Sequence, residues 1–303
     1  MPLYSRTCPS RIDLNERELR LKLRPGRLED VEQVGKIIFE AFTTIAEKHG
    51  FPSDFPSIDA GRNDAAYFLS HPGYYSVVAE DGGKVIGSNF LDERSTIAGV
   101  GPITIDPKYQ DKGIGRQLMM DVMKRANTKN FPGVRLLQAA YHNRSLSLYA
   151  RLGFEIREPI STMQGKPIRE DVLDRIVRPA AQFDIETCNA ICKAVHGHDR
   201  NGELTDSIKQ GIAKVVVYGE RITGYTTGLT FFNHSIGFTN DDLKALIASA
   251  TSYEGPGILI PSRNSVLLRW CLDKGLKLVQ QLNLMTVGMY NEPFGAYMPS
   301  NVY

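Results

Sequence analysis

One stretch decides how this chain folds: Ile103-Thr104-Ile105-Asp106-Pro107-Lys108-Tyr109-Gln110-Asp111-Lys112-Gly113-Ile114-Gly115-Arg116. Its apolar start predicts a buried strand that ends at Asp106-Pro107, and the residues after it predict an amphipathic helix from about Ile114 to Asn127. The N–H groups at a helix start have no partner within the helix, and the helix dipole adds partial positive charge there. The two glycines allow a ligand close to the backbone, so the loop predicts a diphosphate site.

Two better-known phosphate loops do not fit this stretch. A Walker loop ends in Gly-Lys-Ser/Thr, which is absent, and the dinucleotide fingerprint needs a glycine where Leu118 stands. A bare Gly-x-Gly is also typical of an ordinary turn that starts a helix. The loop by itself therefore leaves its ligand open.

Strands and helices alternate on both sides of the loop, which predicts an α/β (α+β) fold. We expect a Pro-rich loop at His49–Ser57 and a turn at Gly82-Gly83. The expected strands cover Arg20–Arg24, Tyr74–Ala79, Lys84–Leu91, Val100–Ile105 and Val134–Tyr141. One expected helix starts at Asp30, a second runs from about Ile114 to Asn127, and a short third one covers Ser145–Leu152.

The second half of the chain repeats the cues of the first half in the same order, which predicts a duplicated fold. The paired patterns are Arg24…Asp30 with Arg178…Asp184, Gly83–Gly87 with Glu220–Gly224, and Asn143…Tyr149 with Asn264…Trp270. We expect a lead-in over residues 1–19, a first domain over 20–160, a linker near 161–167 and a second domain over 168–303.

Two signatures together point to a family. Gln-x-x-Gly-x-Gly after a strand that ends in Asp-Pro resembles the acetyl-CoA loop of the GNAT acetyltransferase superfamily. Ser-Leu-Ser-Leu-Tyr-Ala-Arg-Leu-Gly-Phe over 145–154 resembles its second signature, a short helix that carries a Tyr and closes with Gly-Phe. The resemblance covers residues 20–158, and the second half looks like a degenerate copy. It implies tandem GNAT-like domains, each with a mixed twisted sheet flanked by helices.

The resemblance also implies acetyl-CoA as co-substrate and transfer of its acetyl group to a primary amine. The backbone of Ile103, Thr104 and Ile105 would bind the pantetheine arm as it would an added strand. Tyr149 would act as general acid on the leaving thiolate, since a tyrosine of pKa about 10 is protonated at neutral pH; it could also simply pack its helix on the sheet. The residues that would surround the pyrophosphate are Gln110, Asp111, Lys112, Gly113, Ile114, Gly115 and Arg116.

The chain departs from the family at one site position. The family usually has an Asn seven residues before the Tyr, where this chain has His142, and Asn143 follows. Either residue could contact the cofactor, and His142 could instead touch the acceptor. A general base is harder to assign: Asp92 and Glu93 close a predicted strand near the cleft, and we nominate Glu93, although surface ion pairs explain both residues as well.

The second half has lost the features of the site. Gly237–Leu243 takes the place of the glycine loop, and Asp241 and Asp242 would repel a pyrophosphate there. Trp270 takes the place of the tyrosine. We therefore expect the second domain to bind no CoA and to be structural or to shape the acceptor site. The aromatic tail Pro293–Tyr303 should dock, either along the acceptor cleft or between the domains.

Composition excludes other classes. A net charge of +2 without a run of Lys or Arg gives no reason to expect nucleic acid. The polar N-terminus, the lack of a long apolar run and four scattered cysteines predict a soluble, cytoplasmic protein without membrane contact. His196-Gly197-His198 is interpreted as a polar loop, so no metal is expected. A small-molecule or peptide amine is the expected acceptor. A homodimer, a longer acyl donor, a hydroxyl acceptor and a non-catalytic acyl-CoA sensor stay open.

Overall fold

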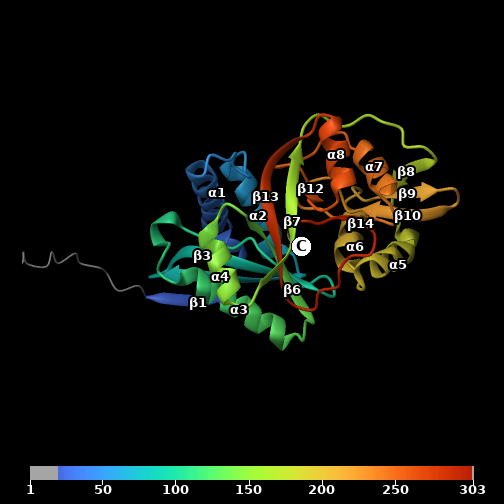
Figure 1. Ribbon diagram of the computed structural model, residues 1–303. Coiled ribbons are helices and arrows are strands. Elements are labelled where there is room, and N and C mark those ends of the chain that lie inside the picture. Colours follow the sequence, from blue (N-terminus) through green and yellow to red (C-terminus); the bar gives the residue numbers. More distant parts are fainter. Residues whose placement is uncertain (1–19, 302–303) are drawn as a thin grey trace, which may run out of the picture.

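The computed structural model describes residues 20–301, which form two halves that meet in a shared sheet (Figure 1). The lead-in over 1–19 and Tyr303 lie outside the described residues. The first half comprises β1 (Leu21–Pro25), α1 (Val31–Lys48), α2 (Ile58–Ser70), β2 (Tyr74–Asp81), β3 (Lys84–Asp92), β4 (Ala98–Val100), β5 (Thr104–Ile105), α3 (Ile114–Thr128), β6 (Gly133–Ala139), α4 (Asn143–Arg151) and β7 (Glu155–Gln164). The second half comprises β8 (Arg175–Pro179), α5 (Ile185–His196), α6 (Asn201–Lys209), β9 (Lys214–Tyr218), β10 (Arg221–Thr226), β11 (Ser235–Gly237), α7 (Asn240–Ala248), β12 (Ile258–Pro261), α8 (Ser265–Asp273), β13 (Lys277–Gly288) and β14 (Ala296–Met298).

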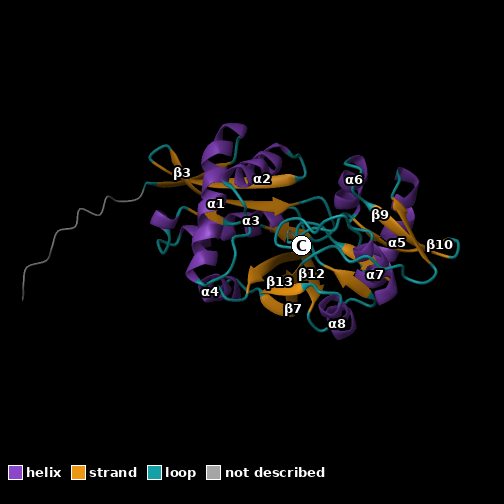
Figure 2. Ribbon diagram, turned by 90° about the horizontal axis from the view of Figure 1, so that it is seen from above, coloured by secondary structure: helices purple, strands orange, loops and turns teal. Residues whose placement is uncertain are grey.

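The predicted α/β fold is confirmed. The larger sheet has the strand order β1-β2-β3-β4-β6-β13-β7-β12, with β5 paired to β3, and the smaller sheet has the order β14-β11-β10-β9-β8. In the first half, α1 and α2 pack on one side of the sheet and α3 and α4 on the other, each pair over its own apolar cluster. Seen from above, β7, β12 and β13 lie between the helices of the first half and those of the second half (Figure 2).

The two halves exchange strands where they meet. β13 comes from the second half, yet it pairs on one side with β6 and on the other with β7, so that Leu282 lies opposite both Ala139 and Ile160. In turn β7, from the first half, also pairs with β12. The expected linker at 161–167 is therefore wrong in its first part, because β7 continues to Gln164 with partners on both edges. The domain ranges 20–160 and 168–303 stay predictions, but the sheet does not divide between them.

The duplication is visible in matching ion pairs. Arg24 Nη1 lies 2.7 Å from Asp30 Oδ2, and Arg178 Nη1 lies 2.7 Å from Asp184 Oδ2. Each aspartate also accepts a hydrogen bond from the backbone N–H three residues before it. Both aspartates are buried at the start of a helix, and the arginine partner lowers the pKa of each. The first predicted repeat is thus confirmed.

The third predicted repeat is wrong by one residue. Helix α4 is followed by Gly153 and helix α8 by Gly275, both with a left-handed backbone. The N–H of the residue after each glycine donates a hydrogen bond to a carbonyl in the last turn of the helix. This bond joins Phe154 N to Tyr149 O in one half and Leu276 N to Cys271 O in the other, at 3.0 Å in both. Tyr149 therefore corresponds to the buried Cys271. Trp270 lies one position earlier and does not replace the tyrosine.

Helix α2 was not predicted. It contains Gly61, which lets the helix pack closely but is unfavourable in helices and so weakens the helical pattern of the sequence. A side chain on Gly61 would come within 2.5 Å of the carbonyl oxygen of Gly35, so the two glycines let α1 and α2 approach backbone to backbone. Glycine disfavours helices by about 1 kcal/mol relative to alanine, which weakens the local signal. Helix α6, which takes the same place in the second half, was also missed.

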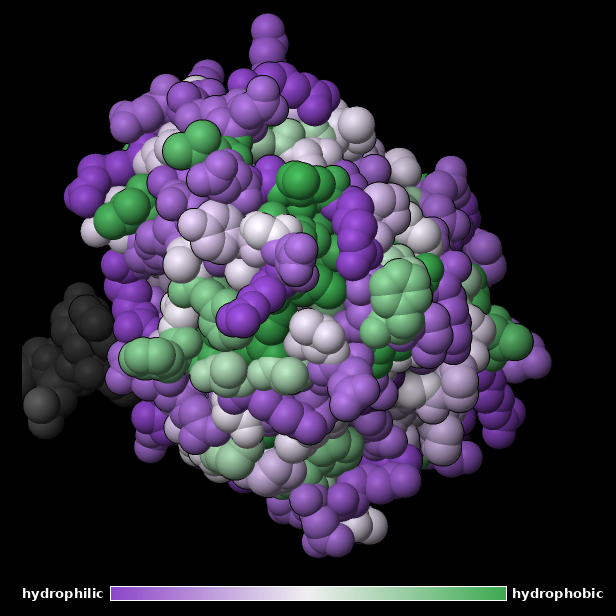
Figure 3. Space-filling model, turned by 90° about the vertical axis from the view of Figure 1, so that its right-hand side faces the viewer, coloured by the Kyte–Doolittle hydropathy of each residue, from purple (hydrophilic) through white to green (hydrophobic). Residues whose placement is uncertain are grey.

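The described part of the C-terminal tail, residues 293–301, docks as predicted. β14 pairs antiparallel with β11, and the N–H of Asn301 donates to the carbonyl of Phe231. Tyr297 is buried, whereas Phe294 is 88% exposed. Figure 3 shows the outer face of the second half, which is mainly hydrophilic with apolar side chains gathered near its centre.

The strand exchange predicts that the first half does not fold alone. A fragment of residues 20–166 would lack β13 and leave the facing edges of β6 and β7 unpaired, and unpaired edges promote aggregation. We expect the fragment to aggregate in size-exclusion chromatography and to recover solubility when it is co-expressed with residues 167–303. A monomeric fragment with cooperative thermal unfolding would contradict this.

Candidate active site

The site is an open wedge between two parallel strands. β4 and β6 pair at Ala98 with Val134 and at Gly99 with Arg135, and beyond these positions a cavity of about 600 Å³ lies between the diverging segments. The expected strand Val100–Ile105 is broken at residues 101–103, because Pro102 has no N–H and Gly101 takes a φ of +132°. One edge of β5 still pairs with β3. The other edge of β5 pairs with no strand among residues 20–301.

Most of the predicted site residues line this one cavity. It is lined by Ile103, Thr104, Ile105, Gln110, Asp111, Gly113, Ile114, Gly115, Arg116, His142 and Tyr149. Lys112 and Asn143 are not among the lining residues. The Lys112 ammonium lies 5.6 Å from the centre of the Tyr109 ring. The structure therefore brings the glycine loop, the broken strand and the tyrosine together.

The glycine loop leaves the start of α3 open for a ligand. Gly113 is the residue before the helix and has a φ of +77°, and no side chain caps this helix end. A Cβ built on Gly113 would have no atom within 4 Å, so there is empty space beside this residue, which lines the cavity at the start of α3. Asp111 is also left-handed, with a φ of +63°. Uncapped N–H groups that face empty space form a suitable anion site.

Arg144 is a cleft residue that the sequence did not reveal. It lies on the first turn of α4, where its guanidinium contacts both carboxylate oxygens of Asp111 at 2.8 Å and the side-chain oxygen of Gln110 at 2.5 Å. It therefore bridges α4 and the glycine loop across the cavity. Both members of the ion pair are largely exposed, and such a pair contributes little stability. Its position beside the loop makes it available to an anionic ligand.

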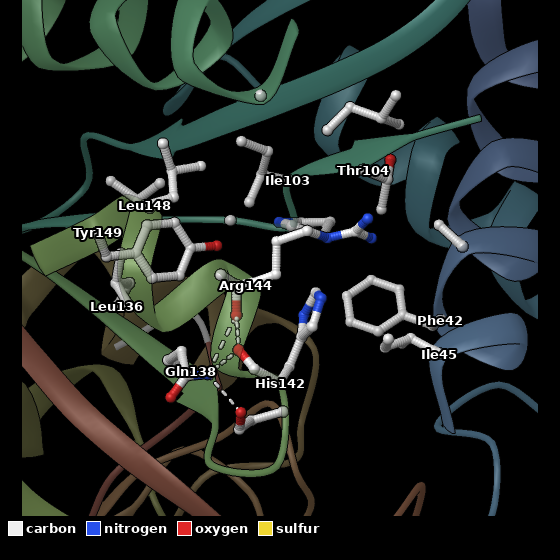
Figure 4. A pocket seen from close by; sticks show the side chains of 18 of the residues that line it. Phe42, Ile45, Ile103, Thr104, Leu136, Gln138, His142, Arg144, Leu148 and Tyr149 are labelled. Atoms are coloured by element: carbon white, nitrogen blue, oxygen red, sulfur yellow. Dashed lines mark hydrogen bonds between the residues drawn. The ribbon is translucent and has the colours of Figure 1, made fainter. Parts of the chain in front are cut away.

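Tyr149 is buried, and its hydroxyl points into the cavity (Figure 4). The ring packs against Phe154, with ring centres 6.1 Å apart. Burial raises the pKa of Tyr149 well above its ordinary value, so the phenol holds its proton throughout the neutral range. The alternative interpretation, a tyrosine that packs its helix on the sheet, is also satisfied by this contact.

His142 lies across the cleft from Tyr149, next to the ring of Phe42 (Figure 4). Burial lowers the pKa of His142 to about 4, so the imidazole is neutral at pH 7. Its Nε2 atom is buried and has no hydrogen-bond partner among residues 20–301. His142 caps α4 in the position that Asn264 has before α8, and the Asn264 side chain accepts from the helix backbone, which the His142 side chain does not.

The geometry does not support Glu93 as the general base. Glu93 binds Arg125 through both oxygens, at 2.6 and 2.9 Å, and does not line the cavity. Asp92 is likewise held by Arg94 at 2.6 Å and lies outside the cavity. Asp92 is the last residue of β3 and Glu93 follows it. Each makes an ion pair, which was the other interpretation of these residues.

In the second half, the equivalent of the wedge is filled by the chain itself. Gly87 pairs with Ile105 in the first half, and Gly224, its counterpart, pairs with Gly237. The free edge at residues 103–105 thus corresponds to the edge of β11, where β14 is bound as an antiparallel strand.

The helix start of the second half is filled too. The carboxylate of Asp242 accepts hydrogen bonds from the N–H and the hydroxyl of Thr239 and forms an ion pair with Arg175 at 2.8 Å. Asp241 is exposed and pairs with Lys244. The predicted acidic cap is therefore confirmed, although one of its two residues, Asp242, does most of the capping.

Within residues 20–301 there is no group of three or more His, Cys, Asp or Glu side chains placed to hold a metal ion. His196 and His198 are buried, so the loop that the sequence suggested to be polar is packed inside the protein. No helix in the described part of the chain has the length and hydrophobicity needed to cross a membrane.

Comparison with known proteins agrees with this geometry. The family model described as Acetyltransferase (GNAT) family matches residues 35–154. These residues are a GNAT acetyltransferase domain. The match begins in α1 and ends at Phe154, so it includes the glycine loop, the wedge and Tyr149. A domain of this family implies acyl transfer from coenzyme A, and acetyl-CoA is the donor that the family uses.

Two solved structures share the fold of about nine tenths of this chain, and one of them is a tandem GNAT protein. A presumed acetyltransferase from Pyrococcus horikoshii matches with a TM-score of 0.71 at 15% identity, covering 91% of this chain and 94% of its own. A tandem GNAT protein from the clavulanic acid biosynthesis pathway matches with a TM-score of 0.54 at 14% identity, covering 89% and 98%. A search of curated proteins finds no match. At these identities the likeness concerns the fold.

The ion pair of Glu93 leads to a prediction. Glu93→Gln should cost about 0.5–1 kcal/mol of stability through the lost pair with Arg125, since a partly exposed pair contributes no more than that. Thermal unfolding measures this loss. Release of CoA thiol with a working acceptor should stay unchanged; a fall of about a hundredfold or more would restore Glu93 as the base.

Proposed function

We propose that this protein transfers the acetyl group of acetyl-CoA to a primary amine, and that the transfer takes place in the wedge between β4 and β6. The observation that carries the proposal is the continuity of the cavity. It runs from an uncapped helix start, suited to a pyrophosphate, along a free strand edge to a buried tyrosine hydroxyl. An extended ligand with an anion at one end and a reactive group at the other fits this path.

The donor would bind as an added strand. Residues 103–105 offer backbone groups along the edge of β5, and the amides of the pantetheine arm can pair with such groups. The second half supports this assignment, because the equivalent edge of β11 binds β14 through an antiparallel ladder. The pyrophosphate would lie at the start of α3, near Arg116 and Arg144.

Tyr149 would act as the general acid. The lone pair of the uncharged amine attacks the thioester carbonyl carbon, the carbon–sulfur bond breaks, and the thiolate takes the phenolic proton. The nitrogen then releases one proton as the amide forms, and the phenol regains one from solvent. Because burial raises the pKa of Tyr149 well above its ordinary value, the acid stays protonated over the working range.

The second half would bind no CoA. A pantetheine arm there would have to displace β14, and a pyrophosphate would meet the buried carboxylate of Asp242. We therefore infer one CoA site per chain and a shaping role for the second half.

Gly113 gives a direct test of the pyrophosphate site. Gly113→Val should abolish CoA binding in calorimetry, because a side chain would fill the space before α3. Gly275→Val is the matched control: Gly275 has a φ of +90° and an equally open Cβ position, but lies after α8 in the second half. The control carries similar backbone strain and should still bind one CoA per chain. Micromolar binding by the Gly113 variant would refute the assignment.

Tyr149 is tested by removing one oxygen atom. Tyr149→Phe should keep CoA affinity and lower kcat by about a hundredfold, the usual contribution of a positioned acid. In the wild type, kcat should show no loss of acid function up to about pH 10, since the raised pKa lies above that of free tyrosine. Unchanged turnover would remove Tyr149 from the mechanism. A wild-type protein that binds CoA but releases no thiol with any acceptor would be a sensor.

A further inference from the structure

Part of the cavity has aromatic walls, and we call this part the aromatic arm. Its lining includes Phe42 from α1, Tyr141 from the turn after β6, and Phe231 from the second half. Phe51 stacks on Tyr141, with ring centres 4.4 Å apart, and Phe55 packs against Phe42 at 5.4 Å. These rings make the arm rigid and apolar. No part of the donor path described above uses it.

One carboxylate lies in the aromatic arm. Asp54 comes from the loop between α1 and α2 and lines the cavity, and the side-chain amide of Gln280 donates to it at 3.1 Å from β13. Among residues 20–301 no Lys, Arg or His forms an ion pair with Asp54, whereas Asp111, the other acid in the cavity, is paired with Arg144. Burial raises the pKa of Asp54 to about 6, so it is still largely ionised at pH 7.

A second polar atom in the same region lacks a partner. The Nε2 atom of His142 is buried and makes no hydrogen bond to any described residue, and the imidazole is neutral at pH 7. A buried polar group without a partner is costly, and water or a ligand usually satisfies it. His142 lies beside Phe42 in the cleft (Figure 4). The aromatic arm therefore offers a carboxylate and a neutral imidazole nitrogen between aromatic rings.

We propose that the aromatic arm binds the acceptor, and that this acceptor is a primary ammonium on an apolar, ring-bearing body, held through its charge by Asp54. The bound ammonium loses one proton to solvent before its nitrogen attacks the thioester. The inference rests on the proposed acetyl transfer and names its substrate class. A carboxylate in an apolar site needs a cation to offset its lost hydration, and aromatic faces also attract cations. His142 Nε2 completes the site as a hydrogen-bond partner.

The same arrangement disfavours other acceptors. A neutral alcohol would leave Asp54 without a counter-ion, and an acid would be repelled by it. A polyamine would bring further ammonium groups into an arm whose lining supplies one carboxylate, so each extra charge would be desolvated without a partner. The second half takes part in this selection, because Gln280 orients Asp54 and Phe231 forms one wall.

Calorimetry on the full chain saturated with CoA tests the proposal without requiring turnover. The probes are phenethylamine and phenethyl alcohol, which share a body and differ in charge. We expect wild type to bind the amine at least about tenfold more tightly than the alcohol, as a hydrogen-bonded ion pair should provide. Asp54→Asn should lose that preference and leave alcohol binding unchanged. Asp59→Asn, an exposed acid on the next helix, is the matched control and should bind the amine like wild type.

Each outcome decides one claim. Equal amine affinity in wild type and Asp54→Asn, or equal affinity of wild type for amine and alcohol, would overturn the acceptor assignment. Phe42→Leu checks it independently of Asp54, since it keeps an apolar side chain but removes a ring, and should weaken amine binding. Amine binding that depends on Asp54, in a protein that releases no thiol from acetyl-CoA, would refute acetyl transfer while leaving the amine site in place.

Discussion

The site of this protein depends on the point where β4 and β6 stop pairing, because the cavity lies between them beyond that point. Two parallel strands that diverge inside a sheet leave backbone groups which must find other partners, since buried N–H and C=O groups are rarely left unpaired. The two halves solve this in different ways. In the second half β14 pairs with the free edge of β11, whereas in the first half the equivalent edge borders a cavity of about 600 Å³. The same fold can thus hold a ligand in one copy and its own chain in the other.

The strand exchange links the second half to the site of the first. Because β13 lies between β6 and β7, Gln280 reaches the loop between α1 and α2 and holds Asp54 in place. The tail that follows β13 returns to the cavity at Asn301. A degenerate copy can therefore keep a role after losing its own ligand site, since it supplies part of the wall and fixes a polar side chain of its neighbour.

Local patterns in the sequence predicted much of the site. The glycine loop, the helix after it and the Tyr149–Phe154 segment depend on contacts between residues close in sequence, such as helix capping and left-handed turns. Arg24 with Asp30 and Arg178 with Asp184 could be paired for the same reason. The third repeat was predicted one residue out of register, because an Asn followed by an aromatic residue does not fix the register of a helix. The hydrogen bonds accepted by the carbonyls of Tyr149 and Cys271 at the helix ends do fix it.

Local sequence patterns were enough to predict that this chain has two similar α/β halves, one with a glycine loop before a helix and one with an acidic cap in its place. Only the three-dimensional structure shows which strands pair, that Glu93 is held by Arg125 outside the cleft, and that Asp54 and Arg144 line the cavity. The reason is physical. Capping and periodicity act over a few residues, whereas strand pairing and burial join residues more than a hundred positions apart, as Gln280 and Asp54 are, and no short pattern records such contacts.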